Sequence, residues 1–260
     1  MLWIEKPYTK VACISDPHAH LATFEALVSK IPPDYQIIVL GDLIDKGKKA
    51  RELVELIKTK YEALLGNHDN FMTVETNPRY WKQWTSLWIS NNGRDTMKSY
   101  GDKWRIQNVE EHKKTFREHI VYFKNLPLVI ELPNLMVKGK PVILSHSTIS
   151  RAVNHYGSIA RLKEVLQTGK RQEFLANYAR EESTTEDAII QSIMWEQVNE
   201  VDKLPDLGIF NVVGHTVQDN GVQIGNNGAA IDCGVYKNYK MSALLLPELT
   251  IIEQEALPEI

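Results

Sequence analysis

Five short apolar runs, each followed almost at once by an aspartate, asparagine or histidine, limit the fold of this chain more than any other feature. The five are Val11-Ala12-Cys13-Ile14 before Asp16 and His18, Ile37-Ile38-Val39-Leu40 before Asp42, Ala63-Leu64-Leu65 before Asn67, Val142 to Ser145 before His146, and Phe210 to Val213 before His215. Apolar residues at helical spacing separate the first three runs, at 21–31 and 50–59. Strand–helix–strand repetition of this kind predicts βαβ units and a mainly parallel sheet.

The rest of the chain continues this alternation. Further strands are expected at 128–132, 229–232 and 242–246, and helices at 158–167 and 186–200. Two stretches, about 70–125 and 147–205, are mostly helical and contain no linker-like segment. Because 260 residues suffice for one large domain, we expect a single domain over 1–260 with these stretches as helical insertions.

Composition excludes several classes of protein. Hydrophobic residues make up 43% and charged residues 24%, so wholesale disorder is not expected. The longest apolar runs are far shorter than the roughly 20 residues of a membrane span. A net charge of −3 gives no general field for nucleic acid. The first residues lack the pattern of a signal peptide, so we expect a cytoplasmic protein that binds neither membranes nor nucleic acids in general. Its oligomeric state is left open.

The residues after the strands all have side chains of the kinds that bind metal ions. Loops at the carboxyl ends of strands in α/β sheets converge on ligands, and the glycines at 41, 66 and 214 suit tight turns there. Carboxylate, amide and imidazole donors bind divalent metals, and one carboxylate has enough lone pairs to bridge two ions. Two cations roughly 3.5–4 Å apart clamp the attacking and leaving oxygens of a displacement at phosphorus. The pattern therefore predicts a two-metal site for phosphate esters.

The order of these motifs resembles a known family. The motifs are, in order, D-x-H at Asp16, G-D-x-x-D at Gly41, G-N-H-D at Gly66, the later His146 and G-H-T at Gly214. This order is similar to that of the calcineurin-like metallophosphoesterase superfamily. Within it, the chain most resembles the lambda-phosphatase-like serine/threonine protein phosphatases, over about 10–253. The resemblance implies an α/β fold, a four-layer α/β/β/α sandwich of two mixed sheets with helical insertions.

The resemblance also implies roles for single residues. One metal ion would be held by Asp16, His18 and Asp42, with Asp42 bridging, and the second would be completed by Asn67, His146 and His215. His68 would be the general acid toward the leaving group, and Asp45 would orient its imidazole. That pairing has a physical rationale, because a neighbouring carboxylate favours the protonated imidazole that an acid needs. The two ions are expected to be Mn, with Fe, Zn, Mg or Ni as alternatives.

The chain departs from the resembled branch at the residues that grip phosphate. Arginine is usual at three positions that are here Lys46, Leu65 and Gln197, and glycine is usual at Ala19. We expect Lys46 to bind the substrate phosphate as a point charge without the planar fork of arginine. Arginines from other parts of the chain could also reach the phosphate, and the candidates are Arg51, Arg79, Arg94, Arg151 and Arg161.

These observations favour hydrolysis of phosphomonoesters by direct attack of metal-bound hydroxide, as in serine/threonine protein phosphatases. The alternative is a bis(5′-nucleosyl)-tetraphosphatase or another nucleotide phosphoesterase, which Asp69 and the missing arginines favour. The substrate would then be a phosphorylated protein or a nucleotide. A remote alternative is a non-catalytic binding module on the same fold.

Two further groups fit no motif. Trp81, Trp84 and Trp88 recur at helical spacing, so they form either a packed helix face or a cap that stacks on a nucleobase. Surface or capping roles are expected for the remaining histidines, His20, His112, His119 and His155.

Overall fold

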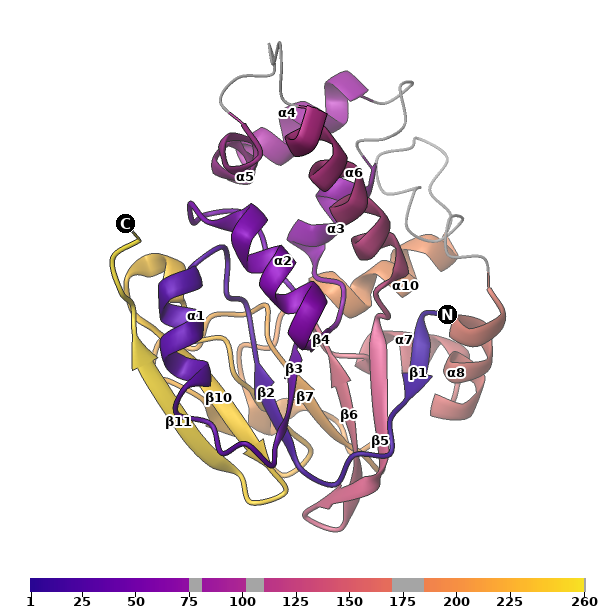
Figure 1. The fold of residues 1–260 in the computed structure, drawn as a ribbon. Coiled ribbons are helices and arrows are strands. Elements are labelled where there is room, and N and C mark those ends of the chain that lie inside the picture. Colours follow the sequence, from indigo (N-terminus) through magenta and orange to yellow (C-terminus); the bar gives the residue numbers. More distant parts are fainter. Residues whose placement is uncertain (75–80, 102–109, 170–184, 260) are drawn as a thin grey trace.

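The computed structural model describes residues 1–74, 81–101, 110–169 and 185–259, and it contains two mixed β-sheets between layers of helices (Figure 1). The first sheet has the order β11-β10-β2-β3-β4. Its strands are β11 (Thr250–Glu255), β10 (Lys240–Leu246), β2 (Val11–Ile14), β3 (Gln36–Val39) and β4 (Glu62–Ala63). Strands β2, β3 and β4 are parallel, as expected, whereas β10 is antiparallel to β2.

The second sheet has the order β1-β5-β6-β7-β9-β8. Its strands are β1 (Trp3–Glu5), β5 (Val129–Val137), β6 (Lys140–Ser145), β7 (Phe210–Val213), β9 (Gly228–Ala230) and β8 (Gln223–Ile224). Strands β6 and β7 are parallel, so their carboxyl ends lie at the same edge of the sheet.

Both faces of each sheet are covered. Along β2, Val11 and Cys13 belong to a hydrophobic cluster that includes residues of both sheets, such as Leu144 and Phe210. Ala12 belongs to a second cluster, which includes residues of the surrounding helices. Because successive side chains of a strand point to opposite faces, this division places one apolar layer between the sheets and another under the helices. The expected sandwich of two mixed sheets is confirmed.

The helices lie outside the sheets and above their carboxyl ends (Figure 1). They are α1 (Leu21–Val28), α2 (Ala50–Lys60), α3 (Asn67–Val74), α4 (Trp81–Ser90), α5 (Gly93–Ser99), α6 (Glu110–Asn125), α7 (Ser150–Tyr156), α8 (Ile159–Thr168) and α10 (Thr185–Trp195), with short 3-10 helices η1 (Val201–Lys203) and η2 (Val235–Lys237). Helix α2 shows the usual cause of such packing, since Ala50, Leu53, Val54 and Ile57 form one buried stripe.

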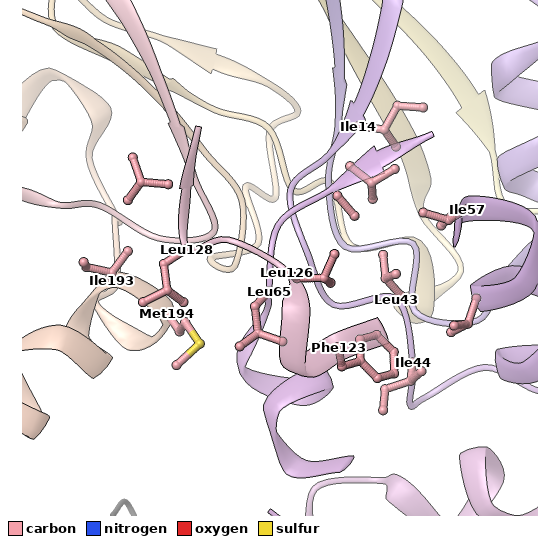
Figure 2. Close-up of a cluster of buried hydrophobic side chains, with 14 of the residues drawn as sticks. Ile14, Leu43, Ile44, Ile57, Leu65, Phe123, Leu126, Leu128, Ile193 and Met194 are labelled. Atoms are coloured by element: carbon pink, nitrogen blue, oxygen red, sulfur yellow. The ribbon is translucent and has the colours of Figure 1, made fainter. Parts of the chain in front are cut away.

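The helical layer packs against segments that follow strands of both sheets. Figure 2 shows part of its core, where Phe123 and Leu126 near the end of α6 lie among Leu43 and Ile44 of one loop and Leu65 of another. One cluster thus includes residues of the helices and of the loops that follow the strands. This continuity supports the single-domain organisation, which stays a prediction.

The structure adds elements that the sequence pattern did not indicate. Strands β1, β8 and β11 and helix α7 were not expected, and β11 is mostly exposed, which leaves little hydrophobic periodicity to detect. The helix expected over 186–200 ends at Trp195, and the amide of Val198 donates to Thr216 instead of continuing the helix. Among the described helices, none is long and apolar enough to cross a membrane.

Leu144→Ala should destabilise the fold, because Leu144 is fully buried between the sheets. We expect a loss of about 2–5 kcal/mol in the free energy of unfolding, the usual cost of a cavity at a buried leucine. Val121→Ala on exposed α6 surface is the control and should stay within about 0.5 kcal/mol of the parent. Chemical denaturation measures both, and equal losses would contradict the assigned core.

Candidate metal centre

Five loops from both sheets meet at one place. The loops after β2, β3 and β4 come from the first sheet, and those after β6 and β7 come from the second. The six expected metal ligands lie on these loops or, for Asn67, at the first residue of the helix that follows, and they are Asp16, His18, Asp42, Asn67, His146 and His215. All are buried except His215, which is half-buried. The site therefore lies where the carboxyl edges of the two sheets meet, which no single sheet could provide.

Asp42 lies between two groups of imidazoles. Its Oδ2 is 3.5 Å from His18 Nε2 and 4.0 Å from His68 Nε2, and its Oδ1 is 3.5 Å from His146 Nε2. Two sets of side chains consequently offer clustered ligand atoms, one of His18, Asp42 and His68 and one of Asp42, His146 and His215. Asp42 belongs to both, which is the arrangement that a bridging carboxylate requires.

The hydrogen bonds of the histidines test whether this donor set fits metal ions. Nδ1 of His18 is 2.9 Å from the carbonyl of Ile44, and Nδ1 of His146 is 2.7 Å from the carbonyl of Leu40. A carbonyl only accepts, so each Nδ1 carries a proton, and a ring with that tautomer has its Nε2 lone pair on the side of Asp42. Lone pairs facing carboxylate oxygens repel one another unless a cation lies between them. The donor set therefore fits divalent metal ions.

The remaining expected ligands adjoin these groups. Asp16 Oδ1 lies 3.9 Å from His18 Nε2, and Asp16 Oδ2 accepts from the backbone amide of His215 at 2.9 Å. Asn67 Oδ1 lies 2.9 Å from His146 Nε2, so an amide oxygen also points into the second group. The structure thus brings all six residues together.

The charges of the buried carboxylates depend on their neighbours. Burial raises the pKa of Asp16 well above its usual value, and the negative charge of Asp42 adds to the effect. Burial would also raise the pKa of Asp42, but the imidazoles of His146, His68 and His18 outweigh it and hold the pKa below the usual range. Asp42 is therefore the carboxylate of the centre whose neighbours hold its pKa low.

Two histidines of the cluster, buried His18 and half-buried His215, have lowered pKa values. Burial lowers the pKa of His18, and the ammonium of Lys46 lowers it further. Burial, followed by His146, lowers the pKa of His215 to about 4. At neutral pH these imidazoles are neutral, which is the form that binds metals, and the ammonium of Lys46 lies against the unprotonated Nε2 of His18.

The loops that carry these ligands have constrained backbones. Asp16, His18, Ala19 and Asp42 all have positive φ, a conformation that is costly for residues other than glycine and is concentrated at functional sites. Ala19 takes φ +58°, so this alanine keeps the left-handed backbone that suits the glycine of the resembled branch.

Two of the three glycines after the strands are needed for close packing rather than for turn geometry. Only Gly41 has positive φ, at +97°. A Cβ on Gly66 would overlap the backbone nitrogen and the carboxylate of Asp42, and one on Gly214 would overlap the side chains of Ser15 and Asp16. The absence of side chains at these positions lets the ligand loops approach one another.

Asp69 holds the loop of Asp42, a role that sequence reasoning missed. Its carboxylate accepts from the amides of Asp42 and Leu43 at 2.8 Å and of Gly66 at 3.0 Å. Burial and the charge of Asp42 raise its pKa to about 7. In the sequence, the only indication of a role for Asp69 was its position directly after His68.

The expected pairing of His68 with Asp45 is present in the geometry. His68 Nδ1 lies 2.7 Å from Asp45 Oδ2, so the other nitrogen, Nε2, faces Asp42 and the metal ligands. Burial raises the pKa of Asp45, whereas its hydrogen bonds from His68, Thr96 and Trp88 oppose the rise. Trp88 and Thr96 come from α4 and α5, and neither contact was expected from the sequence.

Lys46 is the one of the three replaced arginine positions that reaches the centre. Its Nζ lies 2.8 Å from His18 Nε2 and 3.9 Å from the ring centroid of Tyr236. Leu65 is fully buried in the hydrophobic cluster of Figure 2, and Gln197 is exposed. Tyr236, from η2, was not identified in the sequence.

Other expected residues are distributed as follows. Trp88 is fully buried, so it belongs to a packed helix face, while the side chains of Trp81 and Trp84 lie outside the described residues. His119 is buried between Tyr100 and Glu55, so the expected surface or capping role is wrong for it. The apolar spacing of α6 turns it inward.

The arginines from other parts of the chain were candidates for contact with the phosphate. Arg79 lies outside the described residues, and three others form ion pairs with glutamates: Arg51 with Glu52, Arg151 with Glu196 and Arg161 with Glu164.

Comparisons with known proteins agree with this site. The profile of the calcineurin-like phosphoesterase family matches residues 9–227. A candidate diadenosine tetraphosphatase of known structure has a TM-score of 0.55 at 17% identity, over 99% of this chain and 99% of that one. A protein serine/threonine phosphatase from Saccharomyces cerevisiae has a TM-score of 0.58 at 14% identity, over 100% and 85%. Likeness at such low identity shows the fold alone. No match was found among curated protein sequences.

The chain belongs to the calcineurin-like phosphoesterase family, because the family profile covers most of its length and its motifs converge on one centre. It is a metal-dependent phosphoric ester hydrolase. The resemblance inferred from the five motifs is thereby confirmed at the level of the family and the fold.

Asp42→Asn should remove most bound metal and nearly all turnover. The amide has no negative charge, and Asp42 borders both groups of ligands. Elemental analysis of the purified variant, with its thermal unfolding as a check of folding, measures the effect. Asn67→Asp, which keeps an oxygen ligand at a terminal position, is the matched variant and should lose less metal. Full metal content and normal activity in Asp42→Asn would contradict the assignment.

Proposed function

We propose that this protein hydrolyses phosphomonoesters, with Asp16, His18 and Asp42 holding one metal ion and Asn67, His146 and His215 completing a second. The observation that carries the proposal is the position of Asp42, whose two oxygens face different imidazoles at 3.5 Å. When bound, two divalent ions would neutralise phosphate charge and make a nucleophilic water available near neutral pH. Mn²⁺ is the proposed metal, since it accepts mixed oxygen and nitrogen ligands.

His68 is the proposed general acid. Its Nδ1 is bound to Asp45, so its Nε2 is directed toward the ligand cluster where a phosphate ester would lie. A carboxylate beside an imidazole favours the protonated ring, which can give its proton to the departing oxygen. Both side chains are buried, and this fixes their relative orientation.

Lys46 is the proposed phosphate-binding residue. Its ammonium lies at the edge of the ligand cluster, and the ring of Tyr236 faces it at cation–π distance. Lysine offers a single charge where the resembled branch offers arginine forks, so the phosphate would be held with fewer directional bonds. A substrate that also contacts the protein away from its phosphate would compensate for the missing bonds to phosphate.

The second candidate substrate is a bis(5′-nucleosyl) tetraphosphate. Two observations favour it: Leu65 and Gln197 leave the phosphate site short of guanidinium groups, and Asp69 follows His68. The structural likeness to a candidate diadenosine tetraphosphatase over 99% of both chains is compatible with it.

The test is an assay with added Mn²⁺ of a phosphoserine peptide, a phosphothreonine peptide, diadenosine tetraphosphate and a phosphodiester. A preference for the phosphopeptides in kcat/KM supports the first proposal, and a preference for the dinucleotide replaces it with the second. Preference for the phosphodiester would contradict both.

His68→Asn should lower kcat on poor leaving groups such as phenyl phosphate by roughly 10²–10⁴-fold, the usual worth of general acid catalysis. The loss should shrink on p-nitrophenyl phosphate, because that leaving group needs little protonation. Steady-state kinetics on both esters measures the difference. An equal loss on both would contradict the acid role.

Lys46→Ala should weaken turnover of phosphomonoesters by about 1.5–3 kcal/mol in transition-state stabilisation, the worth of a charged hydrogen bond. Lys46→Arg should preserve or improve turnover, since the fork can bond two phosphate oxygens. Metal content should be unchanged in both. A kcat/KM within about twofold for both variants would mean that Lys46 is a solvated residue.

A further inference from the structure

The carboxylate of Asp45 receives more hydrogen bonds than its contact with His68 requires. It is fully buried, and its Oδ2 is 2.7 Å from His68 Nδ1. The indole Nε1 of Trp88 donates to both oxygens, at 3.0 Å to Oδ1 and 2.9 Å to Oδ2. The hydroxyl of Thr96 donates to Oδ1 at 2.6 Å. Two residues of the helical insertion therefore bind the carboxylate that contacts the imidazole, and Trp88 shares Oδ2 with His68.

Thr96 also binds the backbone of Asp45. The amide of Asp45 donates to Thr96 Oγ1 at 2.8 Å, so one hydroxyl accepts from the main chain and donates to the side chain of the same residue. Asp45 has φ +69°, a left-handed conformation that needs support in a residue other than glycine. This reciprocal pair fixes both the backbone and the carboxylate of Asp45 to α5.

The start of α5 packs directly against the indole of Trp88 in α4. Trp88 and Thr96 are both fully buried. A Cβ on Gly93, the first residue of α5, would lie 2.4 Å from Trp88 Nε1 and Cδ1. Only glycine therefore lets α5 begin directly against the indole that donates to Asp45.

These contacts have a consequence for His68. The last torsion of an aspartate side chain is broad, so its own rotamer does not determine where the carboxylate oxygens point. A carboxylate held by Trp88 and Thr96 keeps one oxygen on His68 Nδ1, and this leaves His68 Nε2 directed at the metal ligands. Small losses of orientation are costly in catalysis, because the reacting groups must meet in a narrow range of geometry.

We propose that Trp88 and Thr96 are positioning residues for the His68–Asp45 pair, so that α4 and α5 serve to orient the general acid. The inference rests on the proposed role of His68. It assigns to this part of the helical insertion a function in the catalytic step, separate from any contact with substrate.

The test compares phenyl phosphate with p-nitrophenyl phosphate in metal-loaded full-length variants. Thr96→Val removes the hydroxyl at nearly constant volume, and Trp88→Phe removes the indole N–H together with part of the buried ring. Each should lower kcat on phenyl phosphate on the order of 10-fold or more, within the range of general acid catalysis. KM and metal content should stay close to the parent, and the loss on p-nitrophenyl phosphate should be much smaller. Thr96→Ser, which keeps the hydroxyl, should restore most of the activity.

Two controls separate positioning from a loss of structure. Ser99→Ala removes another hydroxyl of α5, one that binds the carbonyl of Thr96 and does not contact Asp45, and it should leave both rates unchanged. In a His68→Asn background, Trp88→Phe should cause no further loss, because residues that act through one group are not additive. Where Trp88→Phe does not fold, the Thr96→Ser and Thr96→Val pair decides.

Three outcomes overturn the inference: equal losses on the two esters, a Thr96→Ser variant as impaired as Thr96→Val, or an additive loss in the His68→Asn background. If His68→Asn itself shows equal losses on both esters, the proposed acid fails and the positioning role fails with it. A leaving-group-dependent loss in His68→Asn together with an additive Trp88→Phe loss contradicts the positioning role alone.

Discussion

The carboxylate of Asp42, held between imidazoles that turn their lone pairs toward it, is the constraint on which the rest of the centre depends. His18 and His146 are fixed by carbonyls of the loops after β3, and Asp42 itself lies on that loop. Asp69 then ties the amides of Asp42, Leu43 and Gly66 to one carboxylate. These side chains are thus oriented by buried groups of the segments that follow β3 and β4, and such partners fix the orientation of a metal-binding imidazole or carboxylate.

The His68–Asp45 pair depends on a different part of the molecule. Asp45 is on the loop after β3, but its partners Trp88 and Thr96 come from helices of the insertion. The proposed metal ligands and the proposed acid are therefore supported separately, the first by the loop after β3 with Asp69 and the second by α4 and α5. Phosphate binding has the weakest support, since only Lys46 of the three replaced arginine positions lies at the centre.

The metal site was more predictable from sequence than its surroundings. Each candidate ligand lies shortly after a strand, and hydrophobic runs locate strands well. The sequence alone therefore predicted that these side chains meet at the carboxyl ends of the strands. Trp88 and Thr96 could not be found this way. They are separated from Asp45 by 43 and 51 residues, and neither indole nor hydroxyl is unusual on a helix. His119 was misjudged for the same reason, because burial depends on what packs against its helix.

The sequence by itself determined the family, the strands that carry the motifs and the candidate ligands that follow them, because these depend on local hydrophobic patterns and short motifs. The tertiary structure decided that the five loops come from two sheets, that Leu65 is part of the core while Lys46 faces the ligands, and that the insertion binds Asp45. These facts depend on contacts between residues far apart in the chain. Such contacts are set by how whole faces of helices and sheets pack, and local sequence carries little information about them.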